Sequence, residues 1–390
     1  MEEREKSFQS ARVLLFGAGH MVTDCYANFL PALIPMFIDK FGFSLAMGGA
    51  LVSVMVFSGS LLQPLYGYLA DRLKRNWFVI LGPIVAAIFM SAVGLTSSLA
   101  IIFLLVFASG IGVACFHPQA AAMSGQAGSA RHGLGISLFT AGGNIGFGAG
   151  PYFIYLVIRV FGLSKSYIAC FPGILMSLIL LFVVRKQPTQ VGAGVSQNLL
   201  RPILARVKYL LPLFIIVVLR AAVAVSFVSF LPKFLSDRGM TLMMGTIAVL
   251  VFTLVGGFGG ILGGHLSDLI GRKVVILTSL LLSVPFLALA LGVSGNIIFL
   301  FLAIAGFLFY SGNPVNVTFA QEMVPESASL VSSIVMGFGW GIGGFSAWIV
   351  GKLGDLYGLG FALNIVIFLL VVASVFALAL PWKLSPSKSK

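Results

Sequence analysis

Charged residues are scarce in this chain: Asp, Glu, Lys and Arg make up 9% of its 390 residues, and the acidic ones number 11. A soluble domain carries about 25% charged and about 45–50% apolar residues, whereas 59% of this chain is hydrophobic. So few charges cannot cover the surface of a soluble protein of this length. The composition therefore excludes a soluble globular protein and predicts that lipid surrounds much of the surface.

The sequence also lacks the marks of an enzyme. Its three cysteines, Cys25, Cys115 and Cys170, lie in apolar segments without the spacing of a disulfide framework or a metal site. It holds no recognisable nucleophile–base pair and no glycine-rich phosphate loop. We therefore expect no enzymatic activity, no cofactor and no bound metal. The charged N-terminus leads directly into a full-length apolar run, which is unlike a cleaved signal peptide.

Long apolar runs dominate what is present. About 20 such residues cross the hydrocarbon core as a helix, which satisfies its own backbone hydrogen bonds. This rule predicts twelve spans, and glycine or polar residues interrupt the pattern in the first, fourth and tenth. The predicted spans are residues 12–38, 45–70, 77–97, 99–125, 133–160, 167–185, 209–235, 242–267, 273–293, 296–321, 329–353 and 358–381.

The positive residues behind the net charge of +13 are unequally divided between the loops on the two sides of the membrane. Most Lys and Arg residues fall at the termini and in alternate loops, on the side expected to be cytoplasmic. Few fall on the other side, namely Lys40, Arg159, Lys165, Lys233, Arg238 and Lys352. This bias predicts a multi-pass protein of the inner (cytoplasmic) membrane with both termini in the cytoplasm. It explains the positive charge without a nucleic-acid partner.

One short motif occurs twice. GYLADRLKR begins at Gly67 and GHLSDLIGRK begins at Gly264, so that Asp71 and Asp268 stand 197 positions apart, about half the chain. Gly42 and Gly239 match at the same offset. Such duplication is typical of transporters built from two related bundles, with the substrate between them. We predict six-helix bundles at 1–185 and 209–390, joined by a polar linker at 186–208 that is either a passive connection or a tether on the membrane surface.

Ionisable residues inside predicted spans are costly and usually functional. His20 and Asp24 are four residues apart and so share a helix face, and Arg220 corresponds to Thr23 in the repeat. Asp24 and Arg220 are therefore expected to face each other across a central cavity, either as a proton site or as a structural ion pair. Burial disfavours a charged carboxylate and a nearby cation favours it, so such a group can release a proton when its surroundings change.

Asp24, with His20, is our candidate for proton coupling. An arginine and two imidazoles in an otherwise apolar cavity favour an anionic or phosphonate-like cargo, because Arg binds such groups in a bidentate way. The alternative for the histidines is a hydrogen bond to a neighbouring helix, and for Glu322 plain solvation at the membrane edge. The candidate cargo-binding residues are Arg220, His117, Tyr26, Tyr152, Asn144, Tyr310, Asn313 and Trp340.

The 67–75 and 264–273 segments resemble the conserved loop motif of the major facilitator superfamily. This resemblance implies an all-α membrane protein of 12 transmembrane helices, in two six-helix bundles related by a pseudo-two-fold axis. It also implies that Asp71 and Asp268 hold the cytoplasmic gate shut against nearby helix ends and arginines. The candidate gate partners are Arg72, Arg75, Arg131, Arg272 and Glu322. Lys74 stands where the motif usually has its second glycine.

Gly146, Gly150 and Pro151 form a GxxxGP pattern that resembles the antiporter motif of drug exporters, although the trailing glycine pair is missing. Simple helix packing is the alternative. The stretch from Phe116 to Pro151 resembles the fosmidomycin-resistance branch of the superfamily. The resemblance implies a proton-driven exporter of a small antibiotic phosphonate that works by alternating access, and we expect the protein to be a monomer. The open alternatives are an uptake symporter for a small organic anion and a membrane sensor that transports nothing.

Overall fold

The computed structural model describes residues 2–73, 76–127, 132–184 and 200–382. All secondary structure in these ranges is helical, and twelve segments are long and apolar enough to cross a membrane. They coincide in order with the twelve predicted spans, which confirms the multi-pass all-α architecture. The segments are Ala11–Phe41, Leu45–Ala70, Trp77–Leu95, Leu99–Ala127, Leu138–Phe161, Leu163–Val184, Val207–Asp237, Leu242–Ile270, Arg272–Gly292, Ile297–Met323, Leu330–Tyr357 and Leu359–Leu378.

Several spans consist of more than one helical element, with short π or 3₁₀ turns labelled η. The first half contains α1 Glu2–Ala27, α2 Leu30–Phe41, α3 Leu45–Val56, η1 Phe57–Leu61, α4 Gln63–Leu73, α5 Trp77–Ser91, η2 Ala92–Leu95, α6 Leu99–Ala127, α7 His132–Phe161, η4 Leu163–Cys170 and α8 Phe171–Val184. The second half contains α9 Leu200–Ala205, α10 Val207–Asp237, α11 Leu242–Ile270, α12 Arg272–Gly292, α13 Ile297–Ser311, α14 Asn313–Met323, η5 Pro325–Ser327, α15 Ala328–Ser333, η6 Ile334–Phe338, α16 Gly339–Gly344, α17 Ser346–Tyr357 and α18 Leu359–Leu378.

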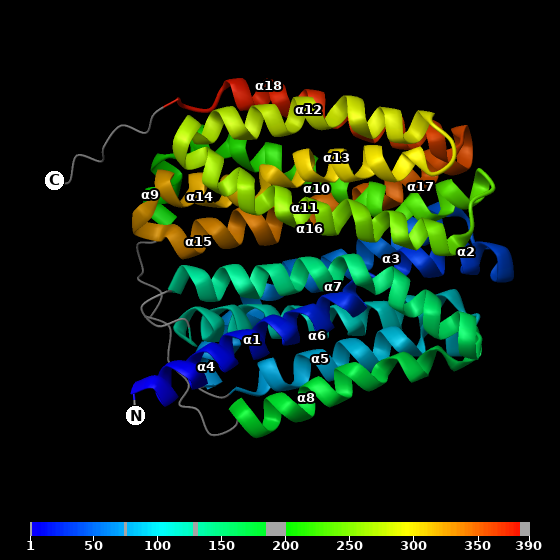
Figure 1. Ribbon diagram of the computed structural model, residues 1–390, viewed down its shortest axis with the longest axis horizontal. Coiled ribbons are helices and arrows are strands. Elements are labelled where there is room, and N and C mark those ends of the chain that lie inside the picture. The colour runs from blue at the N-terminus through cyan, green and yellow to red at the C-terminus, as the bar shows by residue number, and fades with distance from the viewer. Residues whose placement is uncertain (1, 74–75, 128–131, 185–199, 383–390) are drawn as a thin grey trace.

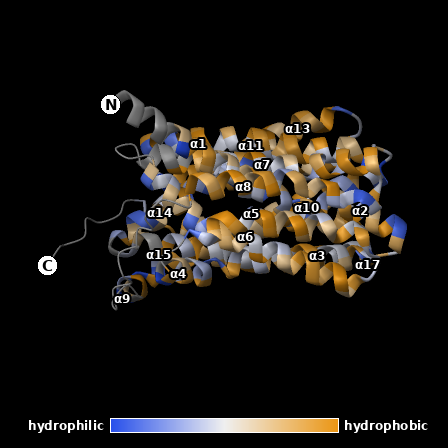
Figure 2. Ribbon diagram, turned by 90° about the horizontal axis from the view of Figure 1, so that it is seen from below, coloured by the Kyte–Doolittle hydropathy of each residue, from blue (hydrophilic) through white to orange (hydrophobic). Residues whose placement is uncertain are grey.

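The helices run along the long axis of the molecule, with those of the first half on one side and those of the second half on the other (Figure 1). Helix α1 begins and helix α18 ends at the same end of the molecule, which we call the terminal end; the opposite one is the far end (Figure 1). Hydrophilic residues gather at both ends and hydrophobic residues cover the length between them (Figure 2). Of the predicted linker at 186–208, residues 186–199 lie outside the described residues. The remaining part, 200–208, forms α9 and the start of α10.

The first span is broken where Asn28 separates α1 from α2. The Asn28 side-chain amide donates a 2.6 Å hydrogen bond to the Phe147 carbonyl in α7, and Pro31 and Pro35 remove two backbone donors from α2. The tenth span is broken at Gly312, between α13 and α14. Both interruptions fall in spans that the sequence marks as interrupted. The fourth span is continuous as α6, although it contains Pro118.

Glycines bring α1 and α7 into backbone contact. A Cβ at Gly142, Gly146 or Gly150 would lie 2.1, 2.0 or 2.3 Å from a carbonyl oxygen of α1. No side chain fits at such distances. These three glycines, spaced four residues apart on α7, therefore set how closely the two helices approach. Gly150 and Pro151, both buried, end this surface beside the break at Asn28. The GxxxGP pattern therefore acts as a packing surface, whatever else it does.

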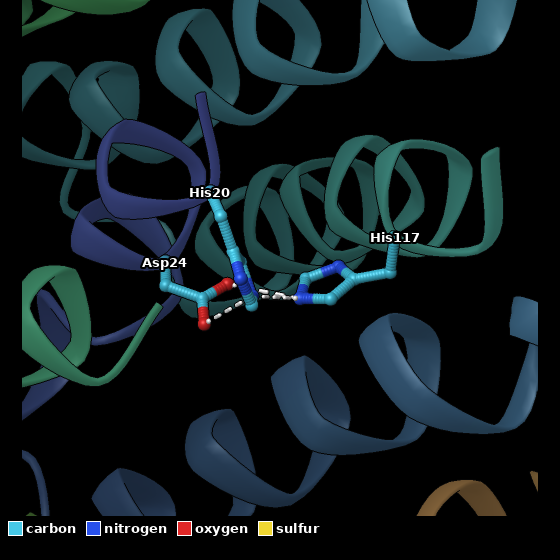
Figure 3. Close-up of side chains that lie close together, drawn as sticks. All are labelled: His20, Asp24 and His117. Carbon is cyan, nitrogen blue, oxygen red and sulfur yellow. Dashed lines mark hydrogen bonds and ion pairs between the residues drawn. The ribbon is translucent and has the colours of Figure 1, made fainter. Parts of the chain in front are cut away.

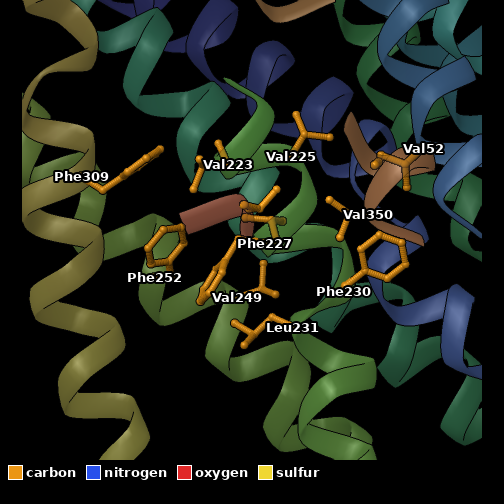
Figure 4. Packing of buried hydrophobic residues seen from close by; sticks show 14 of the residues in the cluster. Val52, Val223, Val225, Phe227, Phe230, Leu231, Val249, Phe252, Phe309 and Val350 are labelled. Atoms are coloured by element: carbon orange, nitrogen blue, oxygen red, sulfur yellow. The ribbon is translucent and has the colours of Figure 1, made fainter. Parts of the chain in front are cut away.

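Helix α10 is the centre of the second half. It packs against α2, α11, α16 and α18, and nearly every residue from Arg220 to Leu235 is buried. Phe227 packs with Phe252 of α11, which in turn contacts Phe309 of α13 (Figure 4). A helix that is apolar on all sides belongs inside a bundle. Besides Lys233, which pairs with the exposed Asp237, Arg220 is the charged residue of this stretch, and it is held among apolar helices.

We predict that Gly146→Ala lowers the thermal unfolding midpoint in detergent, because its new methyl group would displace the Met21 carbonyl and separate α1 from α7. Overpacking of this kind costs about 1–3 kcal/mol. The matched control is Gly257→Ala in α11, where a Cβ meets nothing within 4 Å. Equal midpoints for both variants would contradict this account of the α1–α7 contact.

Candidate functional site

Three ionisable side chains converge near the break in the first span (Figure 3). His20 and Asp24 come from α1, and His117 comes from α6. The Nε2 atoms of the two histidines lie 2.9 Å apart, and each lies 3.1 Å from one carboxylate oxygen of Asp24. The sequence spacing predicted the pair on α1. His117, which we expected to contact cargo, lies instead in the same cluster.

The Nδ1 atoms of both histidines are already occupied. The Nδ1 atom of His20 lies 2.7 Å from the Phe139 carbonyl of α7, and that of His117 lies 2.7 Å from the Val113 carbonyl one turn earlier. A carbonyl oxygen only accepts hydrogen bonds, so each Nδ1 carries a hydrogen. This assignment follows from the hydrogen-bond network. It leaves both Nε2 atoms and the carboxylate facing one another.

The cluster can hold a cation at its centre. Neutral imidazoles with Nδ1–H present only lone pairs at Nε2, and a carboxylate also only accepts. Separations of 2.9–3.1 Å are hydrogen-bond distances, so at least one proton, or a metal ion, must lie between these acceptors. Two imidazole nitrogens and a carboxylate oxygen are also a donor set that Zn²⁺ accepts.

Apolar groups surround the cluster without sealing it. The Phe139 ring stacks on His20 with ring centres 4.0 Å apart, and Phe116 tilts against it at 6.3 Å. Gly143 leaves the room that the His20 ring occupies, because a Cβ there would lie 2.3 Å from it. The side chains of Asp24 and His117 remain 16% and 19% exposed. The cluster in the first half of the protein is therefore only partly enclosed.

Arg220 forms a second, separate charge. It is 2% exposed, donates through Nη2 to the Ser279 hydroxyl at 2.7 Å, and donates through Nη1 to the Phe309 carbonyl. The Phe309 ring centre lies 5.3 Å from the guanidinium carbon. Among the described residues no carboxylate pairs with Arg220, and its Nε has no hydrogen-bond partner. The expected pairing of Asp24 with Arg220 is not formed in this structure, since Asp24 contacts the histidines.

Unpartnered polar atoms gather around the break in the tenth span. A Cβ on Gly312 would lie 2.7 Å from Nη2 of Arg220, which places the guanidinium at this break. On either side of it, the Tyr310 hydroxyl and the side-chain oxygens of Asn313 and Asn316 are buried without a hydrogen-bond partner. Buried polar groups normally find partners, so these atoms are candidates for contact with a bound molecule. Sequence reasoning missed Asn316.

The remaining candidate cargo residues differ in position. Tyr26 is 1% exposed, and its hydroxyl donates to the Ala169 carbonyl at 2.8 Å and accepts from the Gly173 amide at 2.9 Å. These bonds tie α1 to the sixth span and give Tyr26 a packing role. Tyr152 and Trp340 are half-buried, and Asn144 is exposed on α7.

The second copy of the repeated motif forms an ion-pair network at the terminal end. Arg272 lies 2.6 Å from the carboxylate of Asp268 and 2.7 Å from that of Glu322, and it also donates to the Ser267 hydroxyl. The network joins α11, α12 and α14. Glu322 is therefore a partner of the gate motif as well as a solvated acid.

The first copy of the motif contributes one described side-chain hydrogen bond near the same end of the molecule. Arg72 is exposed, and its guanidinium donates to the Tyr68 hydroxyl at 3.3 Å. The side chain of Asp71 and the whole of Arg75 and Arg131 lie outside the described residues.

Comparisons with known proteins identify relatives along most of the chain. The sequence signature described as Major Facilitator Superfamily matches residues 15–347. The chain is 27% identical to the fosmidomycin resistance protein of Escherichia coli K12 over 346 residues, which cover 86% of this chain and 84% of that protein. It is 26% identical to YfnC, an uncharacterised transporter of the superfamily from Bacillus subtilis 168, over 95% of this chain and 92% of that protein. It is 22% identical to PmrA, a multi-drug resistance efflux pump of Streptococcus pneumoniae, over 66% of each.

Solved structures agree on the fold. A bacterial homologue of the human lysosomal transporter Spinster, in an inward-facing and occupied conformation, superposes with a TM-score of 0.78 at 19% identity, over 97% of this chain and 99% of that one. The nucleoside transporter NupG gives a TM-score of 0.73 at 17% identity over 94% and 98%. With twelve spans and a family signature over most of its length, the chain belongs to the Major Facilitator Superfamily.

Proposed function

We propose that this transporter exports a small anionic compound, such as the phosphonate fosmidomycin, in exchange for protons. The observation that carries the proposal is the convergence of His20, Asp24 and His117 at distances that call for a proton or a metal ion between them. Protons entering through this cluster would drive cargo outward as the halves rock in alternating access. The names of two relatives support export, since one confers fosmidomycin resistance and another is an efflux pump.

Loss of the proton from this cluster would favour a rearrangement of the helices that carry its three side chains. With one proton shared among them, one carboxylate and two imidazoles carry no net charge. Without it, three acceptors face one another at hydrogen-bond distance, and their lone pairs repel. The cluster must then open, and its members sit on α1 and α6, with Phe139 of α7 holding His20. Protonation at one point would thus favour one arrangement of three helices of the first half.

Arg220 is the proposed contact for the cargo's negative charge. Its guanidinium has no carboxylate partner among the described residues, and it lies at the break where the unpartnered oxygens of Asn313 and Asn316 are found. A phosphonate would supply the missing counter-charge, because its oxygens match the guanidinium fork. Arg220 is closed off in the present conformation, so we propose that cargo reaches it when α10 and α13 move apart.

The first test concerns the proton. We expect Asp24→Asn to reduce cargo transport driven by an imposed pH gradient to the level of protein-free vesicles, because the amide cannot exchange a proton. Exchange of labelled for unlabelled cargo without a gradient should persist, since it needs no net proton movement. Both are measured in proteoliposomes, with Asp39→Asn, an exposed acid on α2, as the matched control. Full gradient-driven transport in Asp24→Asn would refute the proton role.

The same vesicles separate the remaining alternatives. A proton gradient that stimulates transport only when protons and cargo start on one side would indicate the uptake symporter instead. Loss of transport after treatment with a chelator, restored by Zn²⁺, would indicate a resident metal ion in the cluster rather than a proton. We expect neither result.

The second test concerns the cargo's charge. Hydrogen bonds to charged groups contribute about 1.5–3 kcal/mol, so we expect Arg220→Gln to weaken binding of fosmidomycin about 10- to 100-fold. Binding of an uncharged ester of the same compound should change little. Arg220→Lys keeps the charge but loses the planar fork and should fall between. Equal loss of affinity for the acid and the ester would assign Arg220 a purely structural role.

A further inference from the structure

The halves of the molecule meet along a seam formed by α3 and η1 on one side and by η6, α16 and α17 on the other. Backbones touch directly along it: a Cβ on Gly49 would lie 2.1 Å from the Ala347 carbonyl oxygen, and one on Gly351 would lie 2.3 Å from that of Leu45. Ser53 donates to the Gly344 carbonyl at 2.9 Å. We call this contact the α3–α17 seam. Val52 and Val350 add buried side chains beside it (Figure 4).

One side chain closes the seam at the far end. The carboxylate of Asp355, on α17, accepts hydrogen bonds from the first two backbone amides of α3, Leu45 at 2.8 Å and Ala46 at 2.9 Å. The first turn of any helix has amides without partners inside the helix. The N-cap residue Ser44 accepts from the Met47 amide alone at 3.1 Å. Two donors of the first half are therefore satisfied by an acid from the second half.

The internal repeat provides a comparison for this contact. Position 158 corresponds to Asp355 at the 197-residue offset, and it is an isoleucine. The other seam, between α7 and α11, keeps the equivalent cap, because the Thr241 hydroxyl accepts from the Met244 amide at 3.3 Å. Next to position 158, Arg159 donates to the Met243 sulfur at 3.6 Å instead. A carboxylate that bridges the halves is thus specific to the α3–α17 seam and is not a consequence of duplication.

We propose that Asp355 is a gate residue, whose bonds to Leu45 and Ala46 hold the far end closed and must break and re-form once in each transport cycle. Alternating access requires the halves to separate at each end in turn. A carboxylate at a helix N-terminus is favoured by the exposed amides and by the helix dipole. Beyond the seam's middle, η1 and η6 contact each other. Both are π turns, at which helices tend to bend. Helices α3 and α17 could therefore separate at the far end by bending at η1 and η6.

The test measures the distance between α3 and α17 directly. Spin labels are placed at Met47 and Leu356, which are 40% and 64% exposed, after the three native cysteines are replaced. In the otherwise unchanged protein we expect double electron–electron resonance to give mainly the closed distance. Asp355→Ala should raise the ratio of open to closed populations about fivefold or more, which is the usual effect of losing a helix cap. Asp355→Asn, which keeps one acceptor, should fall between.

Asp39→Ala is the control, since Asp39 is an exposed acid on α2 in the same half as α3. It should leave the distance distribution unchanged. A distribution in Asp355→Ala identical to that of the control would overturn the proposal, and so would an equal shift in both variants. Should Asp355→Ala fail to fold, Asp355→Asn decides by the same criterion. The measurement uses neither cargo nor a proton gradient, so its outcome is independent of the proposed transport function.

Discussion

The account depends on one constraint: two imidazoles, already committed to backbone carbonyls through Nδ1, face one carboxylate at hydrogen-bond distance. His20 and His117 cannot turn to donate to Asp24 in neutral form without giving up the carbonyls of Phe139 and Val113. The cluster is therefore stable only with a cation among its three acceptors. If that cation is a proton, as we propose, its loss would disturb the geometry and so link a proton gradient to helix movement.

The rest of the structure holds that cluster in place. Glycines of α7 bring its backbone against α1, which positions the Phe139 carbonyl and leaves room for the His20 ring. The break at Asn28 ends α1 one turn after Asp24. In the second half, nearly every residue of α10 from Arg220 to Leu235 is buried, and Arg220 has no carboxylate partner among the described residues. The ionisable cluster and Arg220 thus lie in separate halves, one partly exposed and one closed off, as expected if protons and cargo bind at different places.

Sequence reasoning succeeded where the answer is local. The length and apolarity of a run determine whether it crosses a membrane, so all twelve spans could be predicted, and a spacing of four residues places His20 and Asp24 on one face. It did less well for contacts between helices. The repeat offset aligned Arg220 with the first span, but it does not determine which way a side chain points; Arg220 points toward Ser279 and Phe309.

The sequence did not reveal which residues meet across helices, even where it marked one of the partners. His117 joins Asp24 from 93 positions away (24 to 117), and helical periodicity carries no information about such a pair. Asp355 stands at the edge of its span, where an acid usually only meets solvent, and its role depends on a helix 309–310 positions earlier in the chain. Asn316 became a candidate only because its buried oxygen has no partner.

The most direct test of the central claim is the release of protons when cargo binds to the purified protein in weakly buffered detergent solution, followed with a pH-indicator dye. An exporter that exchanges cargo for protons at this cluster should release protons on addition of fosmidomycin, and the Asp24→Asn protein should release none. Saturable binding of cargo by the unaltered protein without any change in dye absorbance would contradict the account.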